Sequence, residues 1–323
     1  MAIKNMEKRS LGNTNLLITP VGMGVLTVGR TQLNLPVKDG ARIVRYALER
    51  GVNFLDTAEY YETYPYIREA LRGTDFEPVI VSKSLVSSYG GMAKAIEDAR
   101  AAIGRDVIDI FLLHEVRQAP DFENRAGARQ CLIDAKAKGH VRAIGLSTHH
   151  VDAARLCAGQ SEADILFPLI NYKSLGIRNG ANPGTKEDMA AAIKAAAEAG
   201  KGVFAMKAFG GGNLCADYTK AMDYVTGLPG VDSVMIGMGS ESDADAAVDY
   251  CEGKLSADFR PDVGNKRMRV DQGDCEGCGA CISRCTSKAI HYNENGRAEI
   301  DGTACVTCGY CAPICPVRAI IMF

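Results

Sequence analysis

Residues 78–114, PVIVSKSLVSSYGGMAKAIEDARAAIGRDVIDIFLLH, hold one complete strand–helix–strand unit. The segments PVIVSK, which ends at Lys83, and DIFLLH, which ends at His114, are short apolar runs of the kind that form buried strands. Between them, MAKAIEDARAAIG has apolar residues at helical spacing and a closing glycine. The unit therefore predicts two parallel strands joined by a helix, with a polar residue at the end of each strand.

The same alternation continues on both sides of this unit. A hairpin is expected first, over residues 9–30, and eight strands follow from VLTVG onward: residues 25–29, 52–56, 78–83, 109–114, 141–147, 165–172, 202–207 and 231–237. Eight strand–helix units over roughly 250 residues favour a closed (β/α)8 TIM barrel of the α/β class. A doubly wound sheet is the alternative, but the GMG at 22–24 does not continue into the GxGxxG that such a sheet carries after its first strand.

The composition is that of an ordinary globular protein. The chain has 323 residues, of which 47% are hydrophobic and 24% charged, with a formal net charge of −2. No apolar run approaches the roughly 18 residues of a membrane span. The first ten residues contain no apolar stretch typical of a signal peptide. No basic stripe marks a nucleic-acid partner. We therefore expect a cytoplasmic protein whose partners are a small molecule and, for the cysteine-rich end, a redox protein.

Eight of the 12 cysteines lie in the last fifth of the chain. They form two runs with C-x2-C-x2-C-x3-C spacing, each cysteine recurring after 30 residues: Cys275, Cys278, Cys281 and Cys285, then Cys305, Cys308, Cys311 and Cys315. This duplication resembles a bacterial two-cluster ferredoxin, in which three thiolates of a run hold one [4Fe–4S] cluster and the fourth ligates the other. Zinc is the alternative, but two complete runs favour two clusters.

These patterns divide the chain into two modules. We expect the barrel over residues 1–253, a linker over 254–270, and a small α+β dicluster ferredoxin-like domain over 271–323. The other four cysteines (Cys131, Cys157, Cys215 and Cys251) are in no ligand spacing, and we expect them to be small buried hydrophobes. The pair at 149–150, two histidines, is expected to begin a helix or to lie on the surface.

Polar residues end three consecutive strands of the expected barrel. Asp56 ends the second strand, Lys83 the third and His114 the fourth, while Tyr61 follows Asp56 by five residues. Taken singly, each has a structural interpretation: a helix cap, a solvent-facing lysine, a structural histidine. Because the carboxyl ends of barrel strands form the active site, four such residues at successive ends favour a catalytic group.

Five segments resemble the aldo/keto reductase superfamily over about residues 9–253: LGNTNL at 11–16, NFLDTAEYY at 53–61, VSK at 81–83, DIFLLH at 109–114 and IGLS at 144–147. The resemblance implies that Asp56, Tyr61, Lys83 and His114 form the family's catalytic tetrad, and Tyr60 lies one residue off the family spacing. Carbonyl reduction develops negative charge on oxygen, which must then receive a proton. We expect Lys83 to lower the pKa of the Tyr61 phenol and Asp56 to position Lys83. His114 is expected to donate a hydrogen bond to the carbonyl oxygen.

The resemblance also implies NADP(H) or NAD(H), held at the ends of the later strands by Ser147, Thr148, Asn171, Lys207, Gly210, Gly211, Gly237 and Ser240. This sequence departs from the family there. Thr148 replaces the usual Asn, Pro168 stands where a Gln commonly holds the carboxamide, and Lys207 falls near where an aromatic often stacks on the ring.

Two segments are candidates for the cofactor's phosphates. KAFGGGNL at 207–214 either cradles phosphate through backbone N–H groups or is a flexible loop. The GMGSES segment at 237–242 offers a helix N-terminus. It lacks the Lys/Arg pair that usually grips the 2′-phosphate, and the carboxylates of Glu241 and Asp243 would repel one.

A nicotinamide delivers two electrons at once as a hydride, whereas each cluster exchanges one. Our leading hypothesis is a carbonyl oxidoreductase whose clusters pass single electrons to or from a partner protein. A flavin or a substrate radical would then bridge the electron count. The alternatives are a nicotinamide-independent reductase fed directly by the clusters, an electron-transfer protein with a non-catalytic barrel, and clusters that merely staple the C-terminal end.

Overall fold

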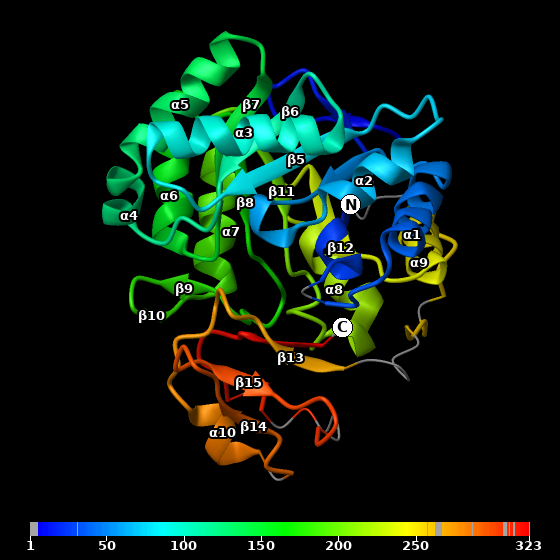
Figure 1. Cartoon of the computed structure of the whole chain (residues 1–323), viewed down its shortest axis with the longest axis vertical. Helices are drawn as coiled ribbons and strands as arrows, with labels where there is room; N and C mark the ends of the chain where they lie inside the picture. Colours follow the sequence, from blue (N-terminus) through cyan, green and yellow to red (C-terminus); the bar gives the residue numbers. More distant parts are fainter. Residues whose placement is uncertain are drawn as a thin grey trace.

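The structure is a computed structural model that describes residues 6–30, 32–256, 258–261, 267–285, 287–305, 309, 311–312 and 314–322. The expected ligand Cys308 and residues 262–266 of the expected linker lie outside the described residues. Figure 1 shows a large body with helices on its outside and, beneath one end of it, a smaller C-terminal part.

The large body is built around a closed barrel of parallel strands in the order β11-β12-β3-β4-β5-β6-β7-β8. This confirms the predicted (β/α)8 TIM barrel. In chain order the strands are β3 (Val21–Gly24), β4 (Phe54–Asp56), β5 (Val79–Ser84), β6 (Ile108–Leu113), β7 (Val141–Thr148), β8 (Ile165–Pro168), β11 (Gly202–Ala205) and β12 (Ser233–Gly237).

The expected first strand, residues 25–29, is wrong. The barrel strand is β3, which lies four residues earlier and pairs in parallel with β4 and β12, Gly24 lying opposite Asp56 and Gly237. Residues Val25–Val28 form a 3-10 turn, η1, instead. Val25 and Val28 are fully buried, so these β-branched residues mark burial beneath the barrel edge and not extended backbone.

Amphipathic helices follow the strands and cover the outside of the barrel. Ser88, Thr185 and Ser240 cap three of them, each accepting a hydrogen bond from a first-turn N–H. The helices are α1 (Val37–Glu49), α2 (Tyr64–Leu71), α3 (Tyr89–Ile103), α4 (Ala119–Asn124), α5 (Ala126–Ala137), α6 (Val151–Gly159), α7 (Lys186–Glu198), α8 (Tyr218–Thr226) and α9 (Glu241–Cys251). Two loops add a short ribbon, β9 (Arg178–Asn179) with β10 (Asn182–Pro183), and a 3-10 turn, η3 (Cys215–Asp217).

The predicted hairpin is present and closes the amino-terminal end of the barrel. Its strands, β1 (Arg9–Ser10) and β2 (Leu17–Ile18), pair antiparallel. Leu11 and Ile18 are fully buried with Phe54 and Phe204 in one apolar cluster inside the barrel. Gly12 has φ +47°, and a Cβ there would lie 2.3 Å from the backbone nitrogen of residue 202, so only glycine allows this close approach. The interior is therefore packed at this end, and the opposite end is left for function.

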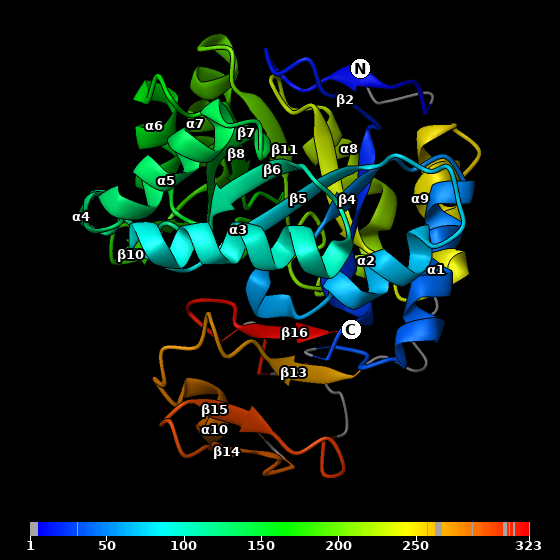
Figure 2. The same ribbon diagram turned by 45° about the horizontal axis from the view of Figure 1, so that its top comes forward.

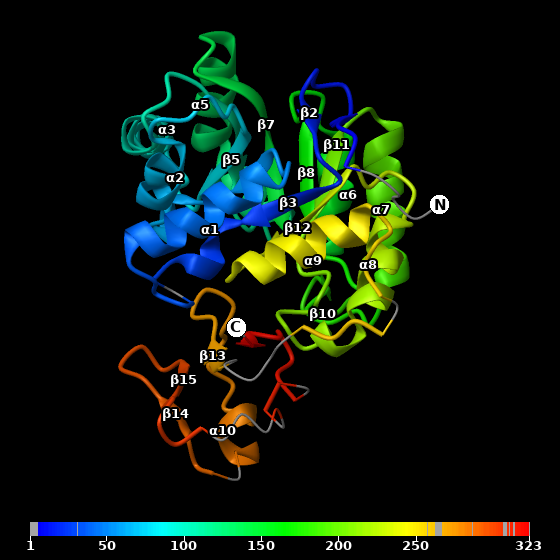
Figure 3. The same ribbon diagram turned by 90° about the vertical axis from the view of Figure 1, so that its right-hand side faces the viewer.

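The C-terminal part consists of two short antiparallel ribbons and one helix. β13 (Met268–Val270) pairs with β16 (Ile320–Met322), and β14 (Ile290–Tyr292) pairs with β15 (Ala298–Ile300), while α10 covers Ala280–Arg284. The expected linker, 254–270, thus ends in a strand of this part. Figures 2 and 3 show β16 lying beside β13, between the barrel end and the rest of the ribbons.

Three of the four outlying cysteines behave as expected. Cys131, Cys157 and Cys251 are buried, whereas Cys215 is half-buried and lines a small cavity at the barrel end. In the described part of the chain, no helix is both long enough and apolar enough to cross a membrane.

Candidate active site

The four residues of the expected tetrad converge at the open end of the barrel. Lys83 of β5 donates hydrogen bonds to Oδ1 of Asp56, at 2.5 Å, and to the Thr57 carbonyl, at 2.7 Å. Its Nζ lies 4.9 Å from the centroid of the Tyr61 ring. The Tyr61 hydroxyl lies 3.4 Å from Nε2 of His114, which follows β6 directly. One phenol, one imidazole and one buried ion pair thus share a single site.

The turn that carries Tyr61 is fixed by polar contacts on both sides. It is the 3-10 turn η2 (Glu59–Tyr61), whose first residue accepts a hydrogen bond from the Ser84 hydroxyl of β5. The hydroxyls of Thr57 and Thr63, on either side of the turn, lie 2.6 Å apart. Glu62 ends it in a left-handed conformation with φ 57°. The DTAEYYET segment therefore holds Tyr61 over the barrel mouth and not inside the sheet.

Burial controls the titration of the tetrad. It raises the pKa of Asp56 and lowers the pKa of Lys83, and in each case the charge of the partner opposes the shift. The expected lowering of the Tyr61 pKa is wrong: burial, followed by the negative charge of Asp56, raises it well above its ordinary value of 10. Burial also lowers the pKa of His114 well below 6.5. Near pH 7 the site therefore presents a protonated phenol beside a neutral imidazole.

A cavity of about 580 Å³ opens in front of the tetrad. That volume lies within the roughly 300–1,000 Å³ of typical small-molecule sites. Its walls come from both parts of the chain: Tyr61, His114, Glu115 and Arg117 belong to the barrel, and Asp271 and Asp274 to the C-terminal part. A small molecule in this cavity would contact the tetrad on one side and the turn at 271–274 on the other.

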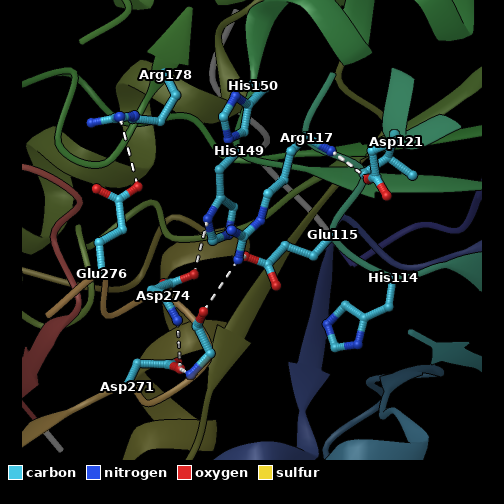
Figure 4. Close-up of polar contacts among 12 residues, drawn as sticks. His114, Glu115, Arg117, Asp121, His149, His150, Arg178, Asp271, Asp274 and Glu276 are labelled. Carbon is cyan, nitrogen blue, oxygen red and sulfur yellow. Dashed lines mark hydrogen bonds and ion pairs between the residues drawn. The ribbon is translucent and has the colours of Figure 1, made fainter. Parts of the chain in front are cut away.

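Asp274 is the centre of a polar cluster that joins the two parts (Figure 4). Its Oδ2 accepts a hydrogen bond from Nζ of Lys207, at 2.8 Å, and its Oδ1 lies 3.5 Å from Nδ1 of His149. Arg117 donates to the Gly273 carbonyl at 3.3 Å. Asp274 immediately precedes Cys275, the first cysteine of the first run. The cluster therefore lies between the barrel mouth and the cysteine-rich domain.

A second contact joins β16 to the loop after β11. The Met322 N–H donates to the Gly211 carbonyl at 2.8 Å, and the Asn213 side chain donates to the Ile320 carbonyl at 3.3 Å. A Cβ on Gly212 would lie 2.4 Å from the Met322 carbonyl oxygen. The glycine loop thus lies directly against the C-terminal strand.

The residues expected to hold a nicotinamide ring are engaged within the chain. The Ser147 hydroxyl accepts from the Glu115 N–H, and the Thr148 hydroxyl donates to the Val116 carbonyl. The Asn171 amide donates to Leu175, and its oxygen accepts from two backbone N–H groups of the same loop. Ser147, Thr148 and Asn171 are all at most 1% exposed.

The segment after β12 also uses its own polar groups. The Ser240 hydroxyl accepts from the Asp243 N–H, and Asp243 accepts from the Gly239 N–H. A Cβ on Gly237 would lie 2.2 Å from the Thr27 hydroxyl oxygen. The Gly210 carbonyl accepts a hydrogen bond from the Asn213 side chain. Cofactor contacts by Gly210, Gly237 and Ser240 therefore stay a prediction.

Described cysteines of the two runs lie close to one another. Burial raises the pKa of Cys281, and the neighbouring thiols of Cys315, Cys275 and Cys278 act in the same direction. The fourth cysteine of the second run thus lies with three of the first. Burial raises the pKa of Cys311 to about 11, and the neighbouring thiols of Cys305, Cys281 and Cys285 act in the same direction.

The spacing of the sulfurs favours clusters over zinc. A single zinc ion would draw its four thiolates to within about 4 Å of one another. In the described part of the chain, no three cysteine sulfurs converge within 4.8 Å. Backbone N–H groups also point at the sulfurs: those of Ala298, Ala289 and Ala319 donate to Cys275, Cys285 and Cys315.

Sequence reasoning missed the residues that join the two modules. The histidine pair at 149–150 lies at the start of α6, as expected, with His150 as the N-cap. The side chain of His149, however, is only 15% exposed and faces Asp274. Burial lowers its pKa to about 3. Glu115, directly after His114, adopts φ 55° and lines the cavity. Position at a strand end was the available signal for Glu115, whereas nothing in the sequence indicates where Asp274 docks.

Glu115 gives a pH-dependent prediction. Burial, followed by the charge of Asp274, raises its pKa to about 7. The unfolded chain releases this proton near pH 4.3, so the folded state binds more protons between about pH 4.3 and 7, and stability falls as the pH rises through that window. The shift corresponds to about 4 kcal/mol at most. We expect the thermal midpoint of the wild type to drop more between about pH 5 and 8 than that of Glu115→Gln. Parallel pH profiles of the two proteins would contradict this.

Comparisons with known proteins identify both modules. The sequence model described as "Aldo/keto reductase family" matches residues 20–227, and that described as "4Fe-4S dicluster domain" matches residues 267–316. A 6-dehydroglucose reductase of Novosphingobium aromaticivorans is 29% identical over 170 residues, which are 45% of this chain and 52% of that protein. A 2,5-diketo-D-gluconic acid reductase B of a Corynebacterium species is 31% identical over 119 residues, 35% of this chain and 42% of the other. The chain thus spans about half the length of these curated relatives.

Solved structures show the same fold. A Pseudomonas aeruginosa protein assigned to the aldo-keto reductases superposes with a TM-score of 0.66 at 23% identity, covering 78% of this chain and 98% of the other. The holo form of an aldo-keto reductase from Bacillus halodurans superposes with a TM-score of 0.63 at 20% identity, covering 78% and 92%.

Proposed function

Because this chain belongs to the aldo/keto reductase family and carries a 4Fe-4S dicluster domain, we propose that it interconverts a small carbonyl compound and its alcohol. In this proposal the dicluster domain exchanges the electrons of that reaction with a partner redox protein. The barrel supplies binding and proton chemistry through Asp56, Tyr61, Lys83 and His114. The names of two relatives, both reductases of oxo-sugar compounds, make such compounds the first substrates to test.

Each tetrad residue has a role that follows from its contacts. Tyr61, protonated near pH 7, is the acid that donates its proton to the oxygen of the substrate as negative charge develops there. The neutral His114 lies beside the same hydroxyl and orients the oxygen by a hydrogen bond. Lys83 stabilises the phenolate that remains, and Asp56 holds the Lys83 ammonium in place.

The two [4Fe–4S] clusters, when bound, supply single electrons. Eight cysteines would hold them, with Cys315 joining the first run as the geometry around Cys281 supports. A low-potential one-electron carrier is the class of partner that such a domain takes.

The shared cavity is the observation that carries the proposal. Tyr61 and His114 form one wall, and Asp271 and Asp274, the latter adjacent to Cys275, form the other. An electron-transfer protein with a merely structural barrel has no reason to keep a buried ion pair and a phenol beside a cavity that its dicluster domain lines. Buried charges are costly unless they are paired and hydrogen-bonded, as those of Lys83 and Asp56 are.

The test is an anaerobic assay on the holoprotein with reduced methyl viologen as the electron donor. We expect consumption of viologen that depends on added oxo-sugar or dicarbonyl, with one alcohol product per two electrons, identified by mass spectrometry. The chain stripped of iron serves as the control and should lose the coupled reaction. If no carbonyl or alcohol in a broad panel changes the rate of viologen oxidation or reduction, the proposed reaction is wrong.

A further inference from the structure

At the ring end of the expected nicotinamide cleft, the polar side chains are hydrogen-bonded or ion-paired within the chain. Ser147 and Thr148 are buried and hydrogen-bonded to the backbone of residues 115 and 116, and Asn171 is buried and hydrogen-bonded within its own loop. Lys207 points instead to Asp274 of the dicluster domain and pairs with it at 2.8 Å. Most of this ion pair is buried: the Lys207 side chain is 24% exposed and the Asp274 side chain 8% exposed.

The expected phosphate cradle is occupied by the C-terminal strand. The Gly211 carbonyl accepts from the Met322 N–H, which joins β16 to the glycine loop. Ideal Cβ atoms on Gly211 and Gly212 would lie 2.8 Å from the Ile321 side chain and 2.4 Å from the Met322 carbonyl oxygen. The glycines therefore allow close packing of β16, and the cavity that remains beside them has a volume of about 210 Å³.

The remaining spaces do not suit a dinucleotide. The cavity bordered by Phe167, Met206, Ile321 and Met322 has a volume of about 210 Å³. That is below the roughly 300–1,000 Å³ of a drug-sized ligand, and a dinucleotide is larger still. The 580 Å³ cavity is lined by four carboxylates and four cations, and three of the cations are already paired within the chain: Arg117 with Glu115, Arg125 with Asp121 and Lys207 with Asp274. The fourth, Arg297, donates to the Gln272 carbonyl, so each of these cations is engaged before a pyrophosphate could bind.

We propose that the docked dicluster domain takes the place of nicotinamide in this chain. The turn at 271–274 and β16 fill the cofactor cleft, so the protein binds no nicotinamide dinucleotide. The identity of the reaction rests on the proposed function. The filling of the cleft rests on the observed contacts of the turn at 271–274 and of β16 with the barrel. Electrons then reach the cavity singly, from the side of Cys275, and no hydride is transferred.

This electron route restricts the class of substrate. A 1,2-dicarbonyl compound accepts two electrons and two protons and becomes an enediol, with both protons on oxygen, and then rearranges to a hydroxy carbonyl. No hydrogen has to reach carbon as hydride. Tyr61 supplies one proton, and Glu115, whose pKa is raised to about 7 in the same cavity, supplies the second. An isolated ketone has no second carbonyl to stabilise its one-electron-reduced form.

Nicotinamide binding tests the proposal directly. The anaerobic full-length holoprotein is dialysed to equilibrium against NADH or NADPH at concentrations up to about 1 mM, the upper range of ordinary KM values. We expect no saturable binding of either dinucleotide. Saturable binding in the micromolar range would overturn the proposal, while the viologen-linked assay above would still decide the proposed function.

Docking of β16 against the glycine loop is tested by hydrogen exchange of the Met322 amide in the same holoprotein. We expect slow exchange in the wild type and at least tenfold faster exchange in Lys207→Asp, because that change places two carboxylates together. The double variant Lys207→Asp with Asp274→Lys restores the ion pair and should restore protection. A Met322 amide that exchanges at the unprotected rate in the wild type would show an open cleft and contradict the proposal.

Discussion

Tyr61→Phe is expected to lower the rate of carbonyl turnover by about 10²–10⁴-fold, the usual contribution of a positioned acid. The substitution removes one oxygen atom and leaves the ring, which packs at right angles to His114 with centroids 5.4 Å apart. The Lys83–Asp56 ion pair is a separate contact and stays in place. The loss should therefore fall on turnover, with iron content and thermal midpoint unchanged.

Tyr60→Phe is the matched control because it removes the same atom one residue away. Tyr60 is 46% exposed, whereas Tyr61 faces His114 at the barrel mouth. We expect Tyr60→Phe to retain most of the rate. Equal losses in the two variants, or a larger loss in Tyr60→Phe, would show that Tyr61 is not the acid. Turnover unchanged in both would remove the case for tetrad catalysis.

Cys281→Ser is expected to remove one cluster and to destabilise the part of the C-terminal domain around it. Cys281 is 6% exposed and belongs to the apolar cluster that also contains Met268 and Ile320. Because the thiolates are the ligands, loss of the metal centre is loss of folding free energy for so small a domain. Iron should fall from about eight to about four atoms per chain or fewer. The docked strand β16 should then lose its protection from hydrogen exchange.

The cysteine variants also test which ligands share a cluster. Cys281→Ser and Cys315→Ser should lose the same spectroscopic signal, because Cys315 lies among the thiols that act on Cys281. Cys285→Ser should lose the other. Cys131→Ser, a buried cysteine outside both runs, should keep full iron and sulfide. If Cys285→Ser and Cys281→Ser abolish one and the same signal, the crossed arrangement is wrong.

The barrel could be predicted from sequence because each strand and helix carries its own local pattern. Segments such as PVIVSK and DIFLLH are apolar strands separated by a helix with a closing glycine, and repetition of this unit favours a parallel α/β fold. The first strand was misplaced because Val25 and Val28 are apolar for a different reason: they are buried in a 3-10 turn. β-branched composition reports burial as readily as extended backbone.

The convergence of Asp56, Tyr61, Lys83 and His114 could be predicted because the residues lie at or just after strand ends, and the closed barrel brings those ends together. Their role as a catalytic tetrad stays a prediction. The titration of Tyr61 could not be predicted, since it depends on burial and on carboxylates from distant segments, including Asp271. The docking of the C-terminal domain on the barrel could not be predicted from the sequence either. Lys207 and Asp274 are 67 residues apart, and neither residue alone indicates the other.

In the proposed reaction, the tetrad and the clusters serve one cavity. This proposal is tested most directly by stopped-flow mixing of the anaerobically reduced holoprotein with a 1,2-dicarbonyl such as butane-2,3-dione, followed in the visible absorption of the clusters. We predict saturable reoxidation that Tyr61→Phe slows by at least about 10²-fold, while ferricyanide, which needs no proton donor, reoxidises both proteins equally fast. Dicarbonyl-dependent reoxidation at equal rates in the two proteins, or none in either, would contradict the account.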